Sequence, residues 1–242
     1  MTPVIETRGL TKSFGRNRVL DGIDLTVGQG ESLVVIGGSG TGKSVLLRAI
    51  LGLEPPDEGV VRLNGRPATP AVRAAFMLDF GMLFQSAALF DSLPVWRNVA
   101  FRLLRTMPAE QARARAVERL ARVGLGRDVA DLMPSELSGG MRKRVGLARA
   151  IAADPKVIFF DEPTTGLDPQ RAASINTLIR EIVTETGATT VTITHDMKSA
   201  RDIAHRVAML SEGRLRWQGT VAELDTAPDE ELRAFVEGRP RD

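Results

Sequence analysis

The sequence predicts an α/β fold, and three observations support this prediction. Residues 32–36 form a short apolar run of the kind found in buried parallel strands, and residues 45–51 after it carry leucine and isoleucine at helical spacing. The apolar run 157–160 and the alternating run 190–194 are each followed by a helical pattern, at about 169–186 and 196–204. Strands that alternate with helices are typical of a parallel sheet covered by helices.

A small antiparallel sheet is predicted beside the strand at 32–36. Its strands are the runs 4–9, 19–27 and 60–63, with turns at Gly15–Arg18 and at Asn64-Gly65. Residues 66–80 are irregular to helical in pattern. Residues 81–84 then predict a buried strand that delivers Gln85 at its end.

Residues 86–135 predict a helical insertion in this frame. From Pro108 onward one apolar stripe recurs at helical spacing, with the members Ala112, Ala116, Val117, Leu120 and Val123. The arginines lie mostly off this stripe, so we expect them to face solvent: Arg113, Arg115, Arg119 and Arg122. Ser138 then begins a long helix through Ala153, which Pro155 ends.

The last part of the chain predicts a hairpin and two short helices. Residues 207–210 and 215–218 pair around Glu212-Gly213. Thr220 and Glu223 form a capping box, and a final helix carries Leu232, Phe235 and Val236.

Composition excludes several kinds of protein. The 242 residues are 43% hydrophobic and 26% charged, which is ordinary for a globular chain. A net charge of +2 does not favour a nucleic-acid partner, and the absence of cysteine excludes disulfides and thiolate chemistry. The N-terminus has no signal-peptide pattern, and no apolar run reaches the ~18 residues of a membrane span. We therefore expect any membrane role to act through a partner.

The most informative stretch is GGSGTGKS at residues 37–44, which lies between a strand and a helix. It fits G-x-x-x-x-G-K-[ST], in which backbone N–H groups at a helix N-terminus surround phosphates. Lys43 is expected to reach the β- and γ-phosphates, and Ser44 to ligate Mg²⁺. The motif predicts that the chain binds a nucleoside triphosphate.

Polar residues at the ends of other strands predict that the chain binds Mg²⁺ and cleaves the γ-phosphate of the nucleotide. Asp161 and Glu162 follow the most apolar strand, where an Asp would hold Mg²⁺ and a Glu would activate water against the γ-phosphate. His195 and Gln85 also end strands, so they are expected to contact the γ-phosphate, the water or the metal. His205 is expected to have only a structural role.

Residues 137–141, Leu-Ser-Gly-Gly-Met, predict a second anion-binding helix N-terminus. One nucleotide does not need two such phosphate sites from one chain. In a dimer, the second can close over the partner's nucleotide.

With these motifs in this order, the chain resembles the nucleotide-binding subunits of ABC transporters over roughly residues 4–236. The resemblance implies a P-loop NTPase, with a RecA-like core and antiparallel β subdomain at about 1–85 and 136–219, a helical subdomain at about 86–153 and C-terminal helices at 220–242. It implies ATP and Mg²⁺ as cofactors, Glu162 and His195 as catalytic residues, and Ser44, Gln85 and Asp161 as metal ligands. The residues implied to bind ATP are Phe14, Gly37, Gly38, Ser39, Gly40, Thr41, Gly42, Lys43, Ser44, Val45, Gln85 and Asp161, with Ser138, Gly139, Gly140 and Asp168 acting on the partner's ATP.

Two positions depart from the family pattern. Phe14 stands where an aromatic residue, usually Tyr, stacks on adenine, and Met141 replaces the usual Gln. The segments Gly81–Ser92, Ser138–Arg144 and Lys43–Leu47 resemble the Mla-type ATPases of phospholipid transport and organic-solvent tolerance. That implies a second copy of the chain, a membrane permease and an MCE-domain lipid-binding protein as partners, at the cytoplasmic face of the inner membrane.

Other functions remain open on sequence alone. An importer of amino acids or other polar solutes would share every motif above and would differ only in the local sequence around Gln85 and Met141. A small-molecule kinase would lack residues 137–141, and an ABC ATPase of DNA repair or translation would need a coiled coil or a second ATPase core.

Overall fold

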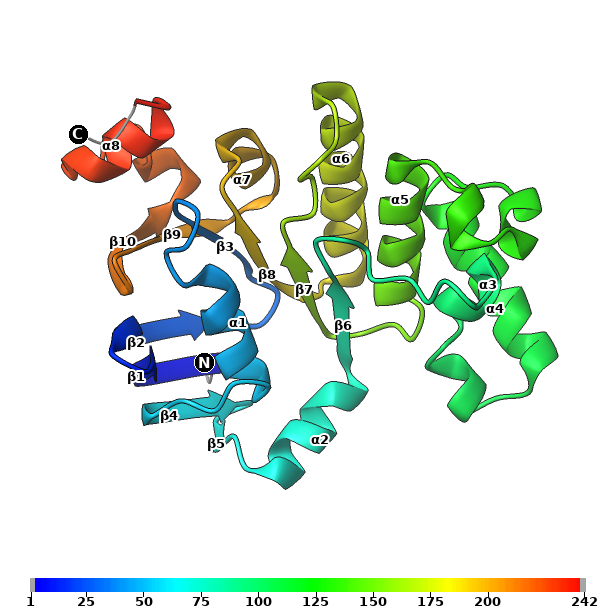
Figure 1. The fold of residues 1–242 in the computed structure, drawn as a ribbon, viewed down its shortest axis with the longest axis horizontal. Coiled ribbons are helices and arrows are strands. Elements are labelled where there is room, and N and C mark those ends of the chain that lie inside the picture. The colour runs from blue at the N-terminus through cyan, green and yellow to red at the C-terminus, as the bar shows by residue number, and fades with distance from the viewer. Residues whose placement is uncertain (1–2, 240–242) are drawn as a thin grey trace. The chain divides into compact units, whose positions relative to one another are not determined.

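The computed structural model describes residues 3–239, which divide into two compact units. One unit comprises the described residues up to Met77 and from Thr189 onward; the other is Leu78–Ala188. Figure 1 shows the course of the chain through both.

The first unit contains the strand that leads into the glycine loop. This strand, β3 (Ser32–Ile36), is buried throughout and pairs in parallel with β8 (Thr189–Thr194) and β9 (Arg206–Ser211), while β10 (Arg214–Thr220) pairs antiparallel with β9. Helix α7 (Met197–Ile203) packs on β3 and β8. Because β3 is buried on both faces, its sequence is continuously apolar after Ser32, whose Oγ donates to the Ile203 carbonyl at 2.6 Å.

A four-stranded antiparallel sheet completes the strands of this unit, in the order β2-β1-β4-β5. Its strands are β1 (Ile5–Phe14), β2 (Asn17–Val27), β4 (Glu58–Leu63) and β5 (Arg66–Pro67). Strand β1 extends beyond the predicted 4–9 because the register shifts between Thr7 and Leu10, where Gly9 has a φ of 57°, and pairing then continues to Phe14.

The helices of the first unit are mostly short. They are α1 (Lys43–Leu51), α2 (Pro70–Leu78, whose last residue belongs to the second unit), α7, the 3₁₀ turn η4 (Val221–Glu223) and α8 (Glu230–Val236). The predicted capping box is present, with Glu223 accepting from the Thr220 backbone N–H at 2.7 Å.

The second unit joins two parallel strands to a group of helices. Strand β6 (Phe80–Leu83) pairs with β7 (Val157–Asp161), and α5 (Gly139–Ala150) packs on β6, α3 (Val95–Val99) and α4 (Ala109–Arg122). The remaining elements are η1 (Leu103–Arg105), η2 (Arg127–Asp131), η3 (Pro134–Glu136) and α6 (Pro169–Thr186). The green ribbons of Figure 1 show α3, α4 and α5 side by side.

Two predictions for this unit are wrong in detail. Helix α5 ends at Ala150 and not at Ala153, because Pro155 disfavours helical backbone at the residue before it and Asp154 has a left-handed φ of 49°. Arg119 does not face solvent: it is 4% exposed on the buried stripe with Ala116 and Val123, and its guanidinium pairs with Asp154 at 2.6 Å.

Candidate functional site

The glycine loop of the first unit is enclosed by backbone. A Cβ at Gly37 would lie 2.3 Å from the Leu210 carbonyl oxygen, and one at Gly42 would lie 2.8 Å from that of Val19. Gly42 also has a φ of 99° and caps helix α1. Only glycine fits both positions, so the two fixed glycines of the motif have a steric cause in this chain.

Lys43, in the first turn of α1, lies across this loop. Its ammonium donates to the carbonyls of Gly37 and Gly38, each at 2.8 Å, and the residue is 7% exposed. Thr41 Oγ1 donates to the Gly38 carbonyl at 3.0 Å, which further fixes the turn. The loop therefore holds a cation and the N–H groups of a helix start together, which is an anion-binding arrangement.

His195 follows strand β8 at the same edge as this loop. The register pairs Ile36 with Thr194, so Gly37 and His195 leave their parallel strands at the same level. His195 is exposed, and Asp196 after it caps α7 by accepting from the Lys198 N–H at 3.0 Å. His205 accepts from the Ser32 N–H at 3.2 Å, as expected of a structural histidine.

Phe14 ends strand β1 with 44% of its surface exposed. Lys12 Nζ lies 5.6 Å from the ring centroid and is held by the Pro55 carbonyl at 2.7 Å and by Asp57 at 2.9 Å. Salt-bridge and hydrogen-bond donation by Lys12 lowers the pKa of the Asp57 carboxyl. The exposed ring is available for stacking on a base.

The second unit brings Gln85, Asp161 and Glu162 together. Strands β6 and β7 are parallel with Leu83 opposite Phe160, so these residues follow at the same strand edge. Glu162 is 9% exposed, has a left-handed φ of 48°, and its Oε2 accepts from Thr165 Oγ1 at 2.9 Å.

Lys143 of helix α5 links these residues, and the sequence prediction did not include it. Its ammonium donates to the carbonyls of Gln85 at 2.6 Å and Glu162 at 3.0 Å, and the residue is 5% exposed. Burial lowers the pKa of Lys143, and the carboxylates of Asp161 and Glu162 oppose this shift. Helical spacing places Lys143 on the face of Leu147 and Ala150, both buried, and this was the signal in the sequence that could have identified it.

Helices α5 and α6 begin side by side in the second unit. Ser138 Oγ caps α5 by accepting from the Met141 N–H at 3.3 Å, and Asp168 caps α6 by accepting from the Arg171 N–H at 2.9 Å. Arg171, which also pairs with Asp168 at 3.2 Å, lines a pocket of about 140 Å³ together with Ser138 and Gly140. Of the residues expected to act on a partner's nucleotide, Ser138 and Gly140 line this hollow, and Asp168 pairs with Arg171 at its wall.

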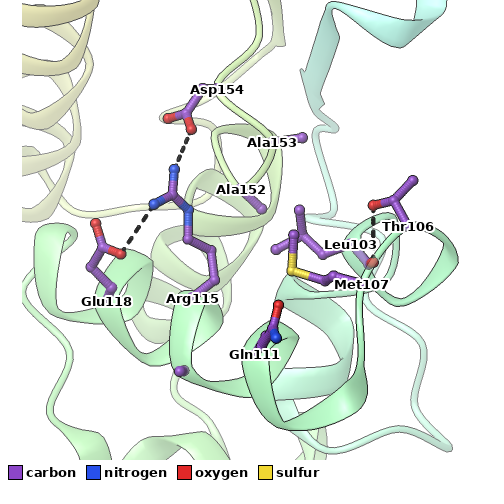
Figure 2. A pocket seen from close by; sticks show the side chains of 10 residues that line it. Leu103, Thr106, Met107, Gln111, Arg115, Glu118, Ala152, Ala153 and Asp154 are labelled. Atoms are coloured by element: carbon purple, nitrogen blue, oxygen red, sulfur yellow. Dashed lines mark hydrogen bonds and ion pairs between the residues drawn. The ribbon is translucent and has the colours of Figure 1, made fainter.

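A larger pocket, of about 620 Å³, lies elsewhere in the second unit (Figure 2). It is lined by η1, the segment after it, α4 and the residues after α5, and Arg115 at its edge pairs with Asp154 and with Glu118. Within the described residues, its lining contains none of the predicted site residues.

Comparisons with known proteins identify the family. Residues 20–165 match the model of the ABC transporter family. The chain is 43% identical over 236 residues to the methionine import ATP-binding protein MetN of Leifsonia xyli, covering 94% of this chain and 69% of that protein. It is 40% identical over 240 residues to the probable ribonucleotide transport ATP-binding protein mkl of Mycobacterium tuberculosis H37Rv, covering 97% and 67%.

Solved structures agree with the sequence relatives. The ATP-binding cassette MJ0796, solved as a dimer in a post-hydrolysis state bound to ADP and Pi, superposes with a TM-score of 0.82 at 30% identity, covering 90% of this chain and 98% of that one. CbiO1 of Clostridium perfringens, part of the transporter complex cbiONQ, gives 0.83 at 28% identity, covering 96% and 93%. The predicted α/β P-loop NTPase fold is confirmed. The chain belongs to the ABC transporter family, and it is an ATP-binding domain that hydrolyses ATP.

Proposed function

We propose that this ATPase works as a pair of copies that close over two ATP molecules and drive a membrane permease. The observation that supports this proposal is that one chain has two helix N-termini suited to an anion. One is the glycine loop before α1, and the other is the Ser138–Gly140 segment at the start of α5. In the proposed dimer, the first holds the chain's own ATP and the second closes over the partner's.

The glycines of α5 support this second site. A glycine in the middle of a helix is less stable than alanine by roughly 0.5–1 kcal/mol. Gly139 and Gly140 are the first two residues of α5, where this cost is an upper bound, and a glycine pair there still calls for a local cause. At Gly139 the φ is not left-handed, and an added Cβ would meet no atom of the described chain within 4 Å. At Gly140 it would make only an ordinary contact, 3.5 Å from Arg171 Cδ. The close approach of a ligand from outside the chain supplies the missing cause.

Replacing Gly139 with alanine is therefore expected to lower ATP turnover without lowering the stability of the fold. Helix propensity should keep the unfolding temperature unchanged or raise it by up to about 4 °C, while the methyl group should lower ATP turnover roughly tenfold or more. Thermal unfolding and steady-state ATPase assays on the full chain measure both. Unchanged turnover would contradict the second phosphate site, and Ser135→Ala, an exposed position in η3, is the control.

Ser44 in the first turn of α1 and the residues at the ends of β6 and β7 fit a magnesium-dependent hydrolysis. Ser44, Gln85 and Asp161 offer hydroxyl, amide and carboxylate oxygens, the donor types that Mg²⁺ prefers, and they would hold it. The ion would neutralise charge developing on the phosphates. Lys43 binds the β- and γ-phosphates, and Phe14 stacks on adenine. Glu162 accepts a proton from the attacking water, and His195 orients that water.

The permease is proposed to contact the second unit at residues 86–97 and the neighbouring exposed aromatic residues. Phe90 and Phe101 are 43% and 45% exposed, and their ring centroids lie 4.5 Å apart. Phe90 follows Gln85 by five residues in the chain, so movement at the ATP site has a short route to this pair. No helix within residues 3–239 is long and apolar enough to cross a membrane. We place the chain at the cytoplasmic face of the inner membrane through the permease.

Phospholipid is the proposed cargo, with an MCE-domain lipid-binding protein as a further partner. This rests on the resemblance of residues 81–92 and 138–144 to Mla-type ATPases. The name of the relative MetN favours a second candidate, methionine import. Purifying the tagged chain from membranes and identifying the co-purified permease and bound lipid tests the two. Stimulation of the complex's ATPase by phospholipid vesicles supports phospholipid transport. A solute-binding partner and stimulation by methionine would instead support methionine import.

A further inference from the structure

Helix α5 places two cationic side chains on the loops that follow β6 and β7. Lys143 donates to the carbonyls of Gln85 and Glu162. Six residues further along the helix, Arg149 donates to the carbonyls of Ala87 at 2.6 Å and Ala88 at 2.7 Å. Helix α5, which Ser138 caps, is therefore bonded to both loops by side chains.

The backbone conformation of loop residues that accept from these cations is energetically unfavourable by itself. Glu162, Ala87 and Ala88 have φ values of 48°, 61° and 46°, in the left-handed region that non-glycine residues rarely adopt. Such conformations persist only where the surroundings fix them. The donors of Lys143 and Arg149 reach these residues directly, so they stabilise the conformation in which the loops present their side chains.

Lys143 is the only one of the two that contacts both functional loops. Its ammonium has three donors and spans from the Gln85 carbonyl to the Glu162 carbonyl, and the negative charges of Asp161 and Glu162 favour a cation there. An apolar side chain of similar length would leave two carbonyls of these loops without this donor.

We propose that Lys143 is a positioning residue for ATP hydrolysis, which fixes Gln85 and Glu162 relative to each other and to the helix that begins at Ser138. This inference rests on the proposed roles of Gln85 and Glu162. Because Lys143 bonds to backbone carbonyls, it sets where the Gln85 amide and the Glu162 carboxylate lie without touching ATP itself. Small errors in such placement reduce the chemical step more than they reduce binding.

The test compares Lys143→Met with Lys143→Arg in the full-length chain. For Lys143→Met we expect kcat to fall about tenfold or more, with KM for ATP and the Kd for ATP measured by calorimetry in EDTA both within about twofold of the parent. Lys143→Arg keeps the charge and several donors, so it should recover most of the lost kcat. Lys156→Met is the matched control, because Lys156 is exposed in the same unit and pairs only with Asp79 among its described ion pairs.

Two results would overturn the proposal. One is a folded Lys143→Met chain whose kcat lies within about twofold of the parent. The other is a joint loss of kcat, ATP affinity and unfolding temperature that Lys143→Arg does not recover, which would mean that Lys143 only supports folding. If Lys143→Met does not fold, Lys143→Gln replaces it under the same criteria. Glu162→Gln is assayed in parallel, and full activity there would remove the proposed role of Glu162 independently of the result at Lys143.

Discussion

Replacing Glu162 with glutamine is expected to lower ATP turnover by about 10²- to 10⁴-fold, the usual contribution of a general base. The amide has nearly the shape of the carboxylate and can still accept from Thr165 Oγ1, which lies 2.9 Å from Oε2. The loop should therefore keep its conformation while losing the group that accepts the proton of water. Steady-state phosphate release measures the loss, and calorimetry in EDTA should show unchanged ATP affinity.

The same variant also tests the dimer. Since ATP can bind but is not cleaved, the proposed ATP-bound pair should accumulate and elute at twice the monomer mass on adding ATP and Mg²⁺. Glu181→Gln, an exposed position on α6, provides the control and should turn over ATP normally. Turnover by Glu162→Gln at the parent rate would show that another group is the base.

Replacing Gly37 with alanine is expected to damage both the fold and the site. The new Cβ would lie 2.3 Å from the Leu210 carbonyl oxygen and 2.9 Å from Thr41 Oγ1, so backbone must move. Overpacking of this kind costs about 1–3 kcal/mol, which lowers the unfolding temperature of a chain of this size by roughly 2–12 °C. We expect ATP affinity to fall about tenfold or more, because the displaced backbone carries the phosphate-binding N–H groups.

Alanine variants at two neighbouring glycines separate the effect of the steric contact with Leu210 from that of backbone strain. At Gly38 a Cβ would lie 3.8 Å from Thr41 Cγ2, an ordinary contact, so alanine there should leave the unfolding temperature within about 1 °C. Gly40 has open space but a φ of 77°, so alanine there should cost only the backbone strain, about 1–2 kcal/mol. Equal stability of all three variants would show that the contact with Leu210 does not constrain the loop.

Local chemistry made much of the site predictable. A glycine loop between an apolar strand and a helix has few physical uses besides phosphate binding, so residues 37–44 predicted the ligand before any contact was known. Ser138 is a good cap by residue type, and it accepts the Met141 backbone N–H at 3.3 Å. Parallel strands deliver their next residues to one edge, which is why His195 lies level with Gly37.

The sequence by itself thus determined the fold class, the phosphate loop and the identity of the cap residues, since each depends on neighbours within a few positions. Only the tertiary structure determined which side chains are buried or constrained by residues far away in the sequence. Arg119 lies buried with its guanidinium paired to Asp154. Lys143 is buried with its ammonium donating hydrogen bonds to the Gln85 and Glu162 carbonyls, and Gly37 must be glycine because the Leu210 carbonyl lies against it. Such partners lie 19 to 173 residues apart in the chain, and residue type and periodicity do not identify which residues meet at that range.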